Sequence, residues 1–368
     1  MKSESTAKAE AAASMTDANG NTVYYTTLEA AAAVAVAGIT DSSGHMVCYT
    51  SLQEAVDAAA NGSTITLLDN TSGSGVVVPS GSDITIDLNG YTYTATSTVG
   101  SDGTVTNGFQ LLKDSDITIK NGTIEAGSDS IKILVQNYSN LTLRDVTLDG
   151  TGSANMQYVL SNNNGTTSIE GATSIIAPDG AVAFDVYDYQ DGGYSGVNVT
   201  VDTTGNIDGN IEIGGDGTNP TPTLTIKNGT FDGKIIVNDI MAEKMKGFIT
   251  GGVFASEIPE KYIAEGYGLV KGANGYAVQK ETSSSDTSIL DPSNPNGEGS
   301  DANVNSGSND AGFEPEKPGT DFAPEKLGER VKTLAKTSDN LTPVLVSVVG
   351  LIAISLTAFL FARSRKMR

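Results

Sequence analysis

A short strand motif recurs through residues 82–256 and constrains the fold more than any other feature of the sequence. Its clear copies begin at Ile84, Ile117, Leu141 and Leu224, and in each copy apolar residues alternate with Thr. This alternation has the two-residue period of a strand with one buried face. The clear copies recur at steps of roughly 24 to 33 residues without a helical period between them, which is typical of a β-solenoid rather than a leucine-rich or helical repeat.

Asparagine follows the strand motif in three copies, at Asn89, Asn121 and Asn228. Because Asn tolerates left-handed backbone geometry, we predict that these residues turn the chain at corresponding corners. In stacked coils of three short strands, the Asn side chains would form a hydrogen-bonded ladder while Ile, Leu and Val stack inside. The sequence therefore predicts an all-β fold, with a parallel β-helix over residues 69–280.

Residues 21–68 carry a tandem repeat in which residues 23–28 match residues 47–52. Each copy is predicted to be a short strand followed by a helix, and the helix to cap the solenoid. The second predicted helix has a capping box, one apolar face and a C-cap signal. These features are formed by Ser51, Leu52, Glu54, Ala55, Val56, Ala59, Asn61 and Gly62.

The block 50–280 resembles right-handed parallel β-helices of the pectate-lyase type, particularly the non-catalytic β-helices of secreted proteins from gut Gram-positive bacteria. Residues 49–56 with 62–67 carry this resemblance near the start, and residues 249–254 with 262–271 carry it near the end. The resemblance implies a right-handed coil and an N-terminal α-helical cap. It does not assign an activity, because one fold hosts many functions.

The C-terminal segment 334–368 combines a short polar motif, an apolar run and a basic tail. Residues 344–362 are uncharged and apolar, which is long enough for one membrane helix. Arg363, Arg365, Lys366 and Arg368 follow, so we expect the C-terminus to stay in the cytoplasm. The polar motif before the run consists of Leu334, Ala335, Lys336, Thr337, Ser338 and Asp339.

This order of motif, span and basic tail resembles a sortase cell-wall sorting signal of the LPxTG type. Ala335 stands in place of Pro, and Ser338 stands in place of Gly. The resemblance implies that a sortase cleaves the bond between Thr337 and Ser338 and joins the protein to peptidoglycan. The alternative is a plain tail-anchored membrane protein. Both interpretations place the β-helix outside a Gram-positive cell.

Two further segments are predicted to be disordered. Residues 1–20 form an Ala-, Ser- and Glu-rich tail without the apolar run of a secretory signal, so we expect the export signal to lie beyond a trimmed or misassigned start. Residues 281–333 form an acidic linker of small and polar residues that cannot bury enough area to order itself. The linker would separate the β-helix from the envelope.

Charge and composition exclude several function classes. The formal net charge of −22 argues against nucleic acid as a partner. Cys48 and His45 are the chain's only Cys and His, so a Cys/His zinc site and a Ser-His-Asp triad are excluded. Between residues 50 and 280 Arg144 is the only arginine, and an outward strand position explains it more simply than a role as a lyase base.

The segment 184–194 is the best candidate ligand site in the sequence. Tyr faces can stack on sugar rings, and carboxylates can bind sugar hydroxyls or calcium, although no EF-hand spacing is present. In an extended segment, alternation would expose Asp185, Tyr187, Tyr189 and Asp191 on one side and leave Asp188 opposite. The candidate residues are Asp185, Tyr187, Asp188, Tyr189, Asp191 and Tyr194. The alternative is a solvated loop whose Tyr rings pack over the solenoid.

These features predict a non-catalytic surface protein without a required cofactor, acting as an adhesin or glycan-binding module. Two alternatives stay open. One is a structural stalk that binds no ligand. The other is a polysaccharide lyase or glycosidase, which predicts a pair of carboxylates on one lateral face of the solenoid.

Overall fold

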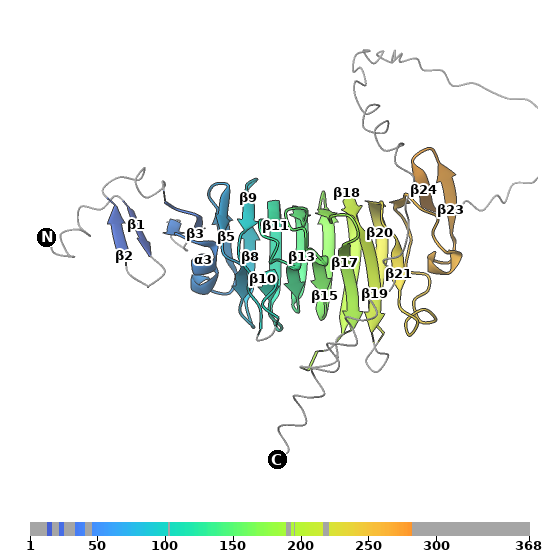
Figure 1. Ribbon diagram of the computed structural model, residues 1–368, viewed down its shortest axis with the longest axis horizontal. Helices are drawn as coiled ribbons and strands as arrows, with labels where there is room; N and C mark the ends of the chain where they lie inside the picture. The colour runs from blue at the N-terminus through green and yellow to red at the C-terminus, as the bar shows by residue number, and fades with distance from the viewer. Residues whose placement is uncertain are drawn as a thin grey trace, which may run out of the picture. The chain divides into compact units, whose positions relative to one another are not determined.

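The computed structural model describes residues 13–16, 22–25, 34–40, 46–101, 104–188, 193–194, 196–215 and 221–281. These residues are mostly β-strand, and among them α3 (Leu52–Ala58) is the one α-helix. From β5 onwards, strands of successive coils lie side by side, and their colour runs from blue to orange in Figure 1.

Within the described residues the strands form two sheets, one of seventeen strands and one of seven. The larger sheet contains β1 (Ala13–Thr16), β2 (Thr22–Tyr25), β3 (Ala37–Thr40), β4 (Met46–Tyr49), β5 (Ser63–Leu67), β6 (Thr71–Gly73), β8 (Asp83–Asp87), β9 (Thr92–Ala95), β11 (Asp116–Ala126), β13 (Asn140–Asp149), β15 (Gly165–Gly171), β16 (Ser174–Ile176), β18 (Val197–Asp208), β20 (Thr223–Phe231), β22 (Val253–Phe254), β23 (Tyr267–Gly272) and β24 (Gly275–Lys280). The smaller sheet contains β7 (Val76–Val78), β10 (Asn107–Leu111), β12 (Ile133–Asn137), β14 (Tyr158–Asn162), β17 (Val182–Asp188), β19 (Asn210–Gly215) and β21 (Ile235–Val237).

The strand motif of the sequence sets the register of the larger sheet. Ile117 in β11 pairs in parallel with Ile84 on one side and with Leu141 on the other. The same row continues through β15 and β18 to Leu224 in β20. The predicted repeat is therefore confirmed, because each motif copy stacks on the copy one coil earlier. We call this stack of coils, from β5 to β22, the solenoid.

The apolar side chains of both sheets meet inside the solenoid. Ile86, Ile119 and Leu143 line the inner face of the larger sheet, and Phe109 and Phe184 line the inner face of the smaller one. Burial of such a continuous apolar column stabilises each coil against its neighbours. Antiparallel pairing occurs near the two ends of the described strands, in the pairs of β3 with β4 and of β23 with β24.

The predicted Asn corners are confirmed in two coils and wrong in the third. Asn89 and Asn121 have positive φ values of 54° and 59°, and Asp145 takes the same role in the next coil with φ of 53°. Asn228 does not adopt positive φ; Gly229 does, with φ of 138°. The pairing of β18 with β20 shifts in register at this point, so this corner is not stacked like the earlier ones.

The Asn ladder forms at a different corner from the one predicted. At the predicted corner, the exposed Asn121 donates from Nδ2 to Oδ1 of Asp87 at 3.1 Å. The ladder instead joins Asn137 and Asn162, which are fully buried, with Nδ2 of Asn137 donating to Oδ1 of Asn162 at 3.2 Å. Thr167 completes it by donating from Oγ1 to Oδ1 of Asn162 at 2.8 Å. Buried amides require hydrogen-bond partners, whereas exposed amides at the first corner can bind water.

Helix α3 matches the second predicted helix over most of its length. The Oγ of Ser51 accepts a hydrogen bond from the backbone N of Glu54, as a capping box requires, and Leu52, Ala55 and Val56 are buried. The Glu54 carboxylate accepts from the backbone N of Thr50 rather than of Ser51. The helix also ends earlier than predicted, because its C-cap is Ala59 and not Asn61-Gly62.

Other predicted segments meet the structure only in part. Of the predicted disordered tail 1–20, Ala13–Thr16 forms β1, which pairs with β2 and β4. The first tandem copy contains β2. The helix predicted after it is wrong at its C-terminal end, where residues 34–36 are irregular and β3 begins at Ala37, and the rest of it lies outside the described residues. No helix in the described part of the chain is long and apolar enough to cross a membrane. The predicted span 344–362 and the sorting motif lie outside the described residues, as does the linker beyond Glu281.

Candidate functional site

The predicted site segment begins in β17, which lies in the smaller sheet between β14 and β19. Strand alternation points Phe184, Val186 and Asp188 inward, and all three are buried. Asp185 and Tyr187 therefore belong to the outer face of the sheet. Tyr189 and Asp191 lie outside the described residues.

The predicted common exposure of the outward residues is wrong for Asp185. Tyr187 is 40% exposed, but Asp185 is only 6% exposed. Its carboxylate lies over β14, where Oδ1 accepts from the backbone N of Asn162 at 2.5 Å and Oδ2 accepts from Oγ of Ser161 at 3.1 Å. Alternation fixes only the direction of a side chain, and here neighbouring coils cover a residue that points outward.

Asp185 belongs to a row of polar side chains that crosses five strands of the smaller sheet. The register places one residue per coil in this row: Gln110, Gln136, Ser161, Asp185 and Glu212. All except Glu212 are buried. Gln136 donates from Nε2 to Oδ1 of Asn163 at 2.6 Å, so the row is linked to its surroundings by hydrogen bonds. The row gives this face a rigid polar floor.

Burial sets the ionisation of the Asp185 carboxyl in this row. Desolvation raises the pKa of Asp185 to about 8, against the opposing effect of the hydrogen bonds from Asn162 and Ser161, and the nearby Glu212 raises it further. A neutral Asp185 carboxyl can donate its proton to Oγ of Ser161 without breaking the contact. Asp185 is therefore expected to be largely neutral at pH 7.

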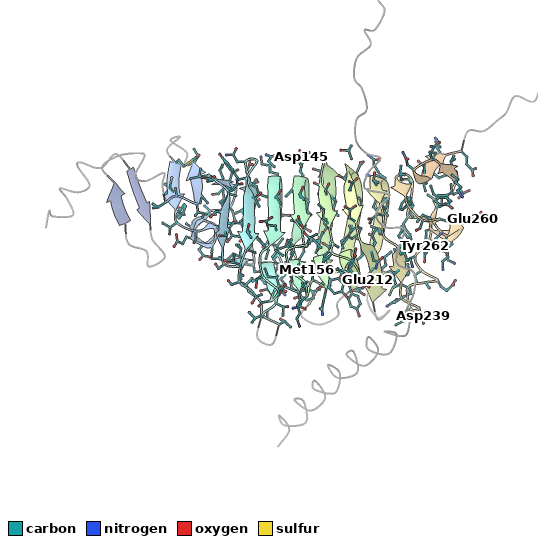
Figure 2. All side chains as sticks on the ribbon, turned by 45° about the horizontal axis from the view of Figure 1, so that its top comes forward. Asp145, Met156, Glu212, Asp239, Glu260 and Tyr262 are labelled. Atoms are coloured by element: carbon teal, nitrogen blue, oxygen red, sulfur yellow. The ribbon has the colours of Figure 1, made fainter. Side chains whose placement is uncertain are left out.

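Tyr158 and Glu212 join Tyr187 on the same face. The Tyr158 hydroxyl donates to Oε2 of Glu212 at 3.2 Å. Burial raises the pKa of Tyr158, and the adjacent carboxylates of Glu212 and Asp185 raise it further, so its hydroxyl keeps its proton. Figure 2 shows Glu212 on the lower side of the solenoid, away from Asp145 at the corner of the larger sheet.

A second pair of aromatic rings lies next to the same sheet. Tyr194 stacks on Tyr138, with ring centroids 5.1 Å apart and planes 10° from parallel. Nζ of Lys113 lies 5.9 Å from the Tyr194 centroid. We call the set Tyr138, Tyr158, Tyr187, Tyr194 and Glu212 the tyrosine face. It brings together residues from four stretches of the chain, of which sequence analysis identified only Tyr187 and Tyr194.

Sequence reasoning missed the other members because they lie one or more coils away. The coil period carried a signal for Tyr138. Asn137 and Val186 lie in one register row, and Tyr138 and Tyr187 are the residues that directly follow them. Reading that row requires the exact length of each coil, which varies along the chain.

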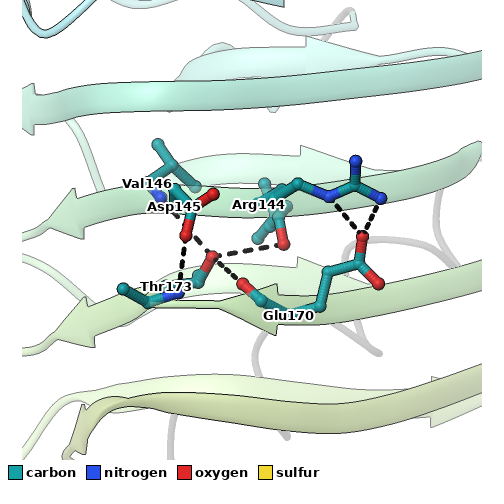
Figure 3. A network of polar contacts seen from close by, with 7 residues as sticks. Arg144, Asp145, Val146, Glu170 and Thr173 are labelled. Carbon is teal, nitrogen blue, oxygen red and sulfur yellow. Dashed lines mark hydrogen bonds and ion pairs between the residues drawn. The ribbon is translucent and has the colours of Figure 1, made fainter.

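The described residues show no set of donors for a metal ion, and Arg144 among them is held in contacts with the neighbouring coil. Within the described residues, no group of three or more His, Cys, Asp or Glu side chains is arranged to hold a metal ion. Arg144 lies on the larger sheet, where its Nε donates to Oε1 of Glu170 at 2.7 Å (Figure 3). The same network joins Asp145 to the backbone N of Ala172 at 2.8 Å, so these residues connect adjacent coils.

Comparison with known proteins gives one match. The model of the NPCBM/NEW2 domain family matches residues 41–159, about a third of the chain. This domain is a carbohydrate-binding module. Neither the curated proteins nor the solved structures contain a match.

The matched range does not coincide with a structural boundary. It ends inside β14, and the same parallel stacking continues through β17, β19 and β21. Tyr138 and Tyr158 lie within the matched range, whereas Tyr187, Tyr194 and Glu212 lie beyond it. The tyrosine face therefore straddles the end of the match.

Proposed function

We propose that the protein binds glycans through the tyrosine face and does not cleave them. The observation that carries this proposal is the exposed ring of Tyr187 on the same face as the hydrogen-bonded pair of Tyr158 and Glu212. A Tyr ring offers a flat apolar surface for a sugar ring, and a carboxylate accepts hydrogen bonds from sugar hydroxyls. The match to a carbohydrate-binding module supports the same class of ligand.

The rigid floor under these residues favours binding. Gln136, Ser161 and Asp185 are held by hydrogen bonds between adjacent strands, so they lose little conformational entropy when a ligand docks above them. The acidic character of the face and of the whole chain favours neutral or positively charged sugars over uronates and sialylated glycans.

We further propose that the chain displays this face at the surface of a Gram-positive cell. The support is the order of motif, apolar run and basic tail in residues 334–368. Under this proposal, sortase acts at Thr337, peptidoglycan receives the protein, and a right-handed β-helix of the pectate-lyase type projects outward as an adhesin. The parallel stacking with one strand motif per coil agrees with such a β-helix.

A polysaccharide-degrading enzyme is the second candidate, and one observation favours it. Asp185 and Glu212 pair across adjacent strands of one face. Adjacent strands lie about 4.8 Å apart, close to the roughly 5 Å between the carboxylates of retaining glycosidases. However, both oxygens of Asp185 are hydrogen bonded to β14 and the residue is buried, so it is poorly placed to give a proton to a glycosidic oxygen.

The test is a binding panel with the purified full chain in detergent. Neutral, amino-sugar and uronate polysaccharides are titrated against the wild type, Tyr187→Ala and Tyr276→Ala, where Tyr276 is a control tyrosine on β24. We expect saturable binding that Tyr187→Ala weakens by roughly tenfold, the order of one lost stacking contact, and that Tyr276→Ala leaves unchanged. Equal effects of both variants, or no binding to any polymer, would contradict the proposal. The release of new reducing ends would favour the enzyme instead.

A further inference from the structure

A groove of about 1020 Å³ lies at the C-terminal end of the solenoid. It is bordered by the 3₁₀ turn η1 (Glu260–Tyr262), by the segment that follows this turn, and by strand β23. Figure 2 shows Glu260 and Tyr262 at this end. The groove shares no residue with the tyrosine face, so its role is independent of the proposed glycan binding.

The floor of the groove is formed by apolar residues at the C-terminal end of the core. Ile263 bridges in parallel to Ile249, which itself bridges to Ile226 in β20. Ile263 is thus the last member of a row that begins in the solenoid, and a further coil would stack on it. Ile263 and Leu269 are partly buried and present the apolar surface of the groove, whereas Ile258, which also lines it, is only 6% exposed.

The rim of the groove is acidic. Glu257, Glu260, Glu265 and Glu281 line it, and all four are exposed. No lysine or arginine is among the residues lining the groove. The adjacent Lys261 is engaged elsewhere, because its Nζ donates to the carbonyl of Ala242 at 3.2 Å and lies 5.3 Å from the Tyr262 ring centroid.

Four carboxylates around one groove produce a negative potential that a positively charged ligand would relieve. The ion pairs of the described residues lie elsewhere, at Lys120 with Asp87, Arg144 with Glu170 and Lys246 with Glu243. Because the floor is apolar and the rim is acidic, a complementary ligand carries apolar side chains flanked by basic ones. A phosphate-bearing or uronate ligand would be repelled by the rim.

We propose that this groove is a docking site for a cationic amphipathic peptide segment of a partner protein. Apolar side chains of the peptide cover Ile263 and Leu269, and its Lys or Arg side chains face the glutamates of the rim. The charges contribute mainly to association rate and orientation, and the apolar contact contributes most of the affinity.

The test is fluorescence anisotropy of labelled synthetic peptides titrated with the full chain. The probes are a Leu/Lys peptide, a Leu/Glu peptide and a Ser/Lys peptide of the same length. We expect the Leu/Lys peptide to bind best, because it alone matches both the floor and the rim. Equal binding of the Leu/Lys and Ser/Lys peptides would overturn the proposal, since it would show attraction to the net charge alone.

Two charge-matched double variants locate the site. Glu260→Gln with Glu265→Gln removes two rim charges, and Asp179→Asn with Asp202→Asn removes two exposed charges far from the groove. The rim variant should weaken Leu/Lys binding by roughly two- to tenfold, as expected for two partly screened ion pairs, and the distant variant by less. Equal weakening by both variants, or no binding by the wild type, would overturn the proposal.

Discussion

At the residue scale, the same type of residue has different roles depending on what covers it. Asn121 and Asn162 both donate or accept hydrogen bonds at corners of the solenoid, but only Asn162 is buried and part of a ladder. Likewise Asp185 and Tyr187 point to one side of β17, yet only Tyr187 is exposed. Periodicity in the sequence predicts the side of the strand to which a side chain points, whereas the exposure of that side chain depends on residues contributed by other coils.

The buried carboxyl of Asp185 should make stability depend on pH. Its folded-state pKa is raised to about 8 from an ordinary value near 4, so between these values the folded state holds a proton that the unfolded state releases. The free energy of unfolding contributed by this group therefore falls as the pH rises through that range. In Asp185→Asn this contribution is absent, while the amide can keep the contacts with Asn162 and Ser161.

We therefore expect Asp185→Asn to gain stability relative to the wild type as the pH rises from about 4 to about 8, by on the order of a few kcal/mol. Denaturant unfolding of both proteins at several pH values measures the difference. A difference that stays constant with pH would show that Asp185 is ionised in the folded state throughout.

At the element scale, the repeat predicted the strands well and the turns less well. The alternation of Ile or Leu with Thr identified β8, β11, β13 and β20, because their inner faces pack on one continuous core. The corner after β20 could not be predicted from the same motif. Residues 120–123 and 227–230 have identical sequences, but Asn121 has positive φ and Asn228 does not, and the pairing of β18 with β20 is shifted in register beside Asn228.

This difference between identical motifs gives a matched pair of variants. Asn121→Val forces a β-branched residue into a left-handed conformation, whereas Asn228→Val does not. We expect Asn121→Val to cost about 1–2 kcal/mol more of unfolding free energy. Denaturant titration of the two variants checks this, and equal losses would mean that the two corners share one backbone conformation.

The tyrosine face was the part of the site least accessible to sequence analysis. Its members come from β14, β17, β19 and the segments next to β12 and β18, so they meet only when the coils stack in register. The local segment 184–194 gave Tyr187 and Tyr194, since aromatic and acidic residues are dense there. No local sequence feature identified Tyr158 or Glu212. Their hydrogen bond forms only because the chain between them has the length of two coils.

At the scale of the whole molecule, the strong negative charge lowers the stability of the folded state, and salt should weaken this effect. With a formal net charge of −22, repulsion among carboxylates opposes the compact state. Raising the ionic strength from about 0.01 M to about 0.15 M shortens the Debye length from roughly 30 Å to roughly 8 Å. We expect Tm to rise over this range in thermal unfolding followed by circular dichroism, and a fall in Tm would show that favourable ion pairs dominate.

Under the proposed function, a glycan lies on the outer face of the smaller sheet. Hydrogen–deuterium exchange of the full chain, with and without a saturating concentration of the polysaccharide that binds best in the panel, tests it directly. We expect slower exchange in peptides that cover β14, β17 and β19, around Tyr158, Tyr187 and Glu212. Protection confined to the larger sheet, or unchanged exchange throughout despite saturation, would contradict it.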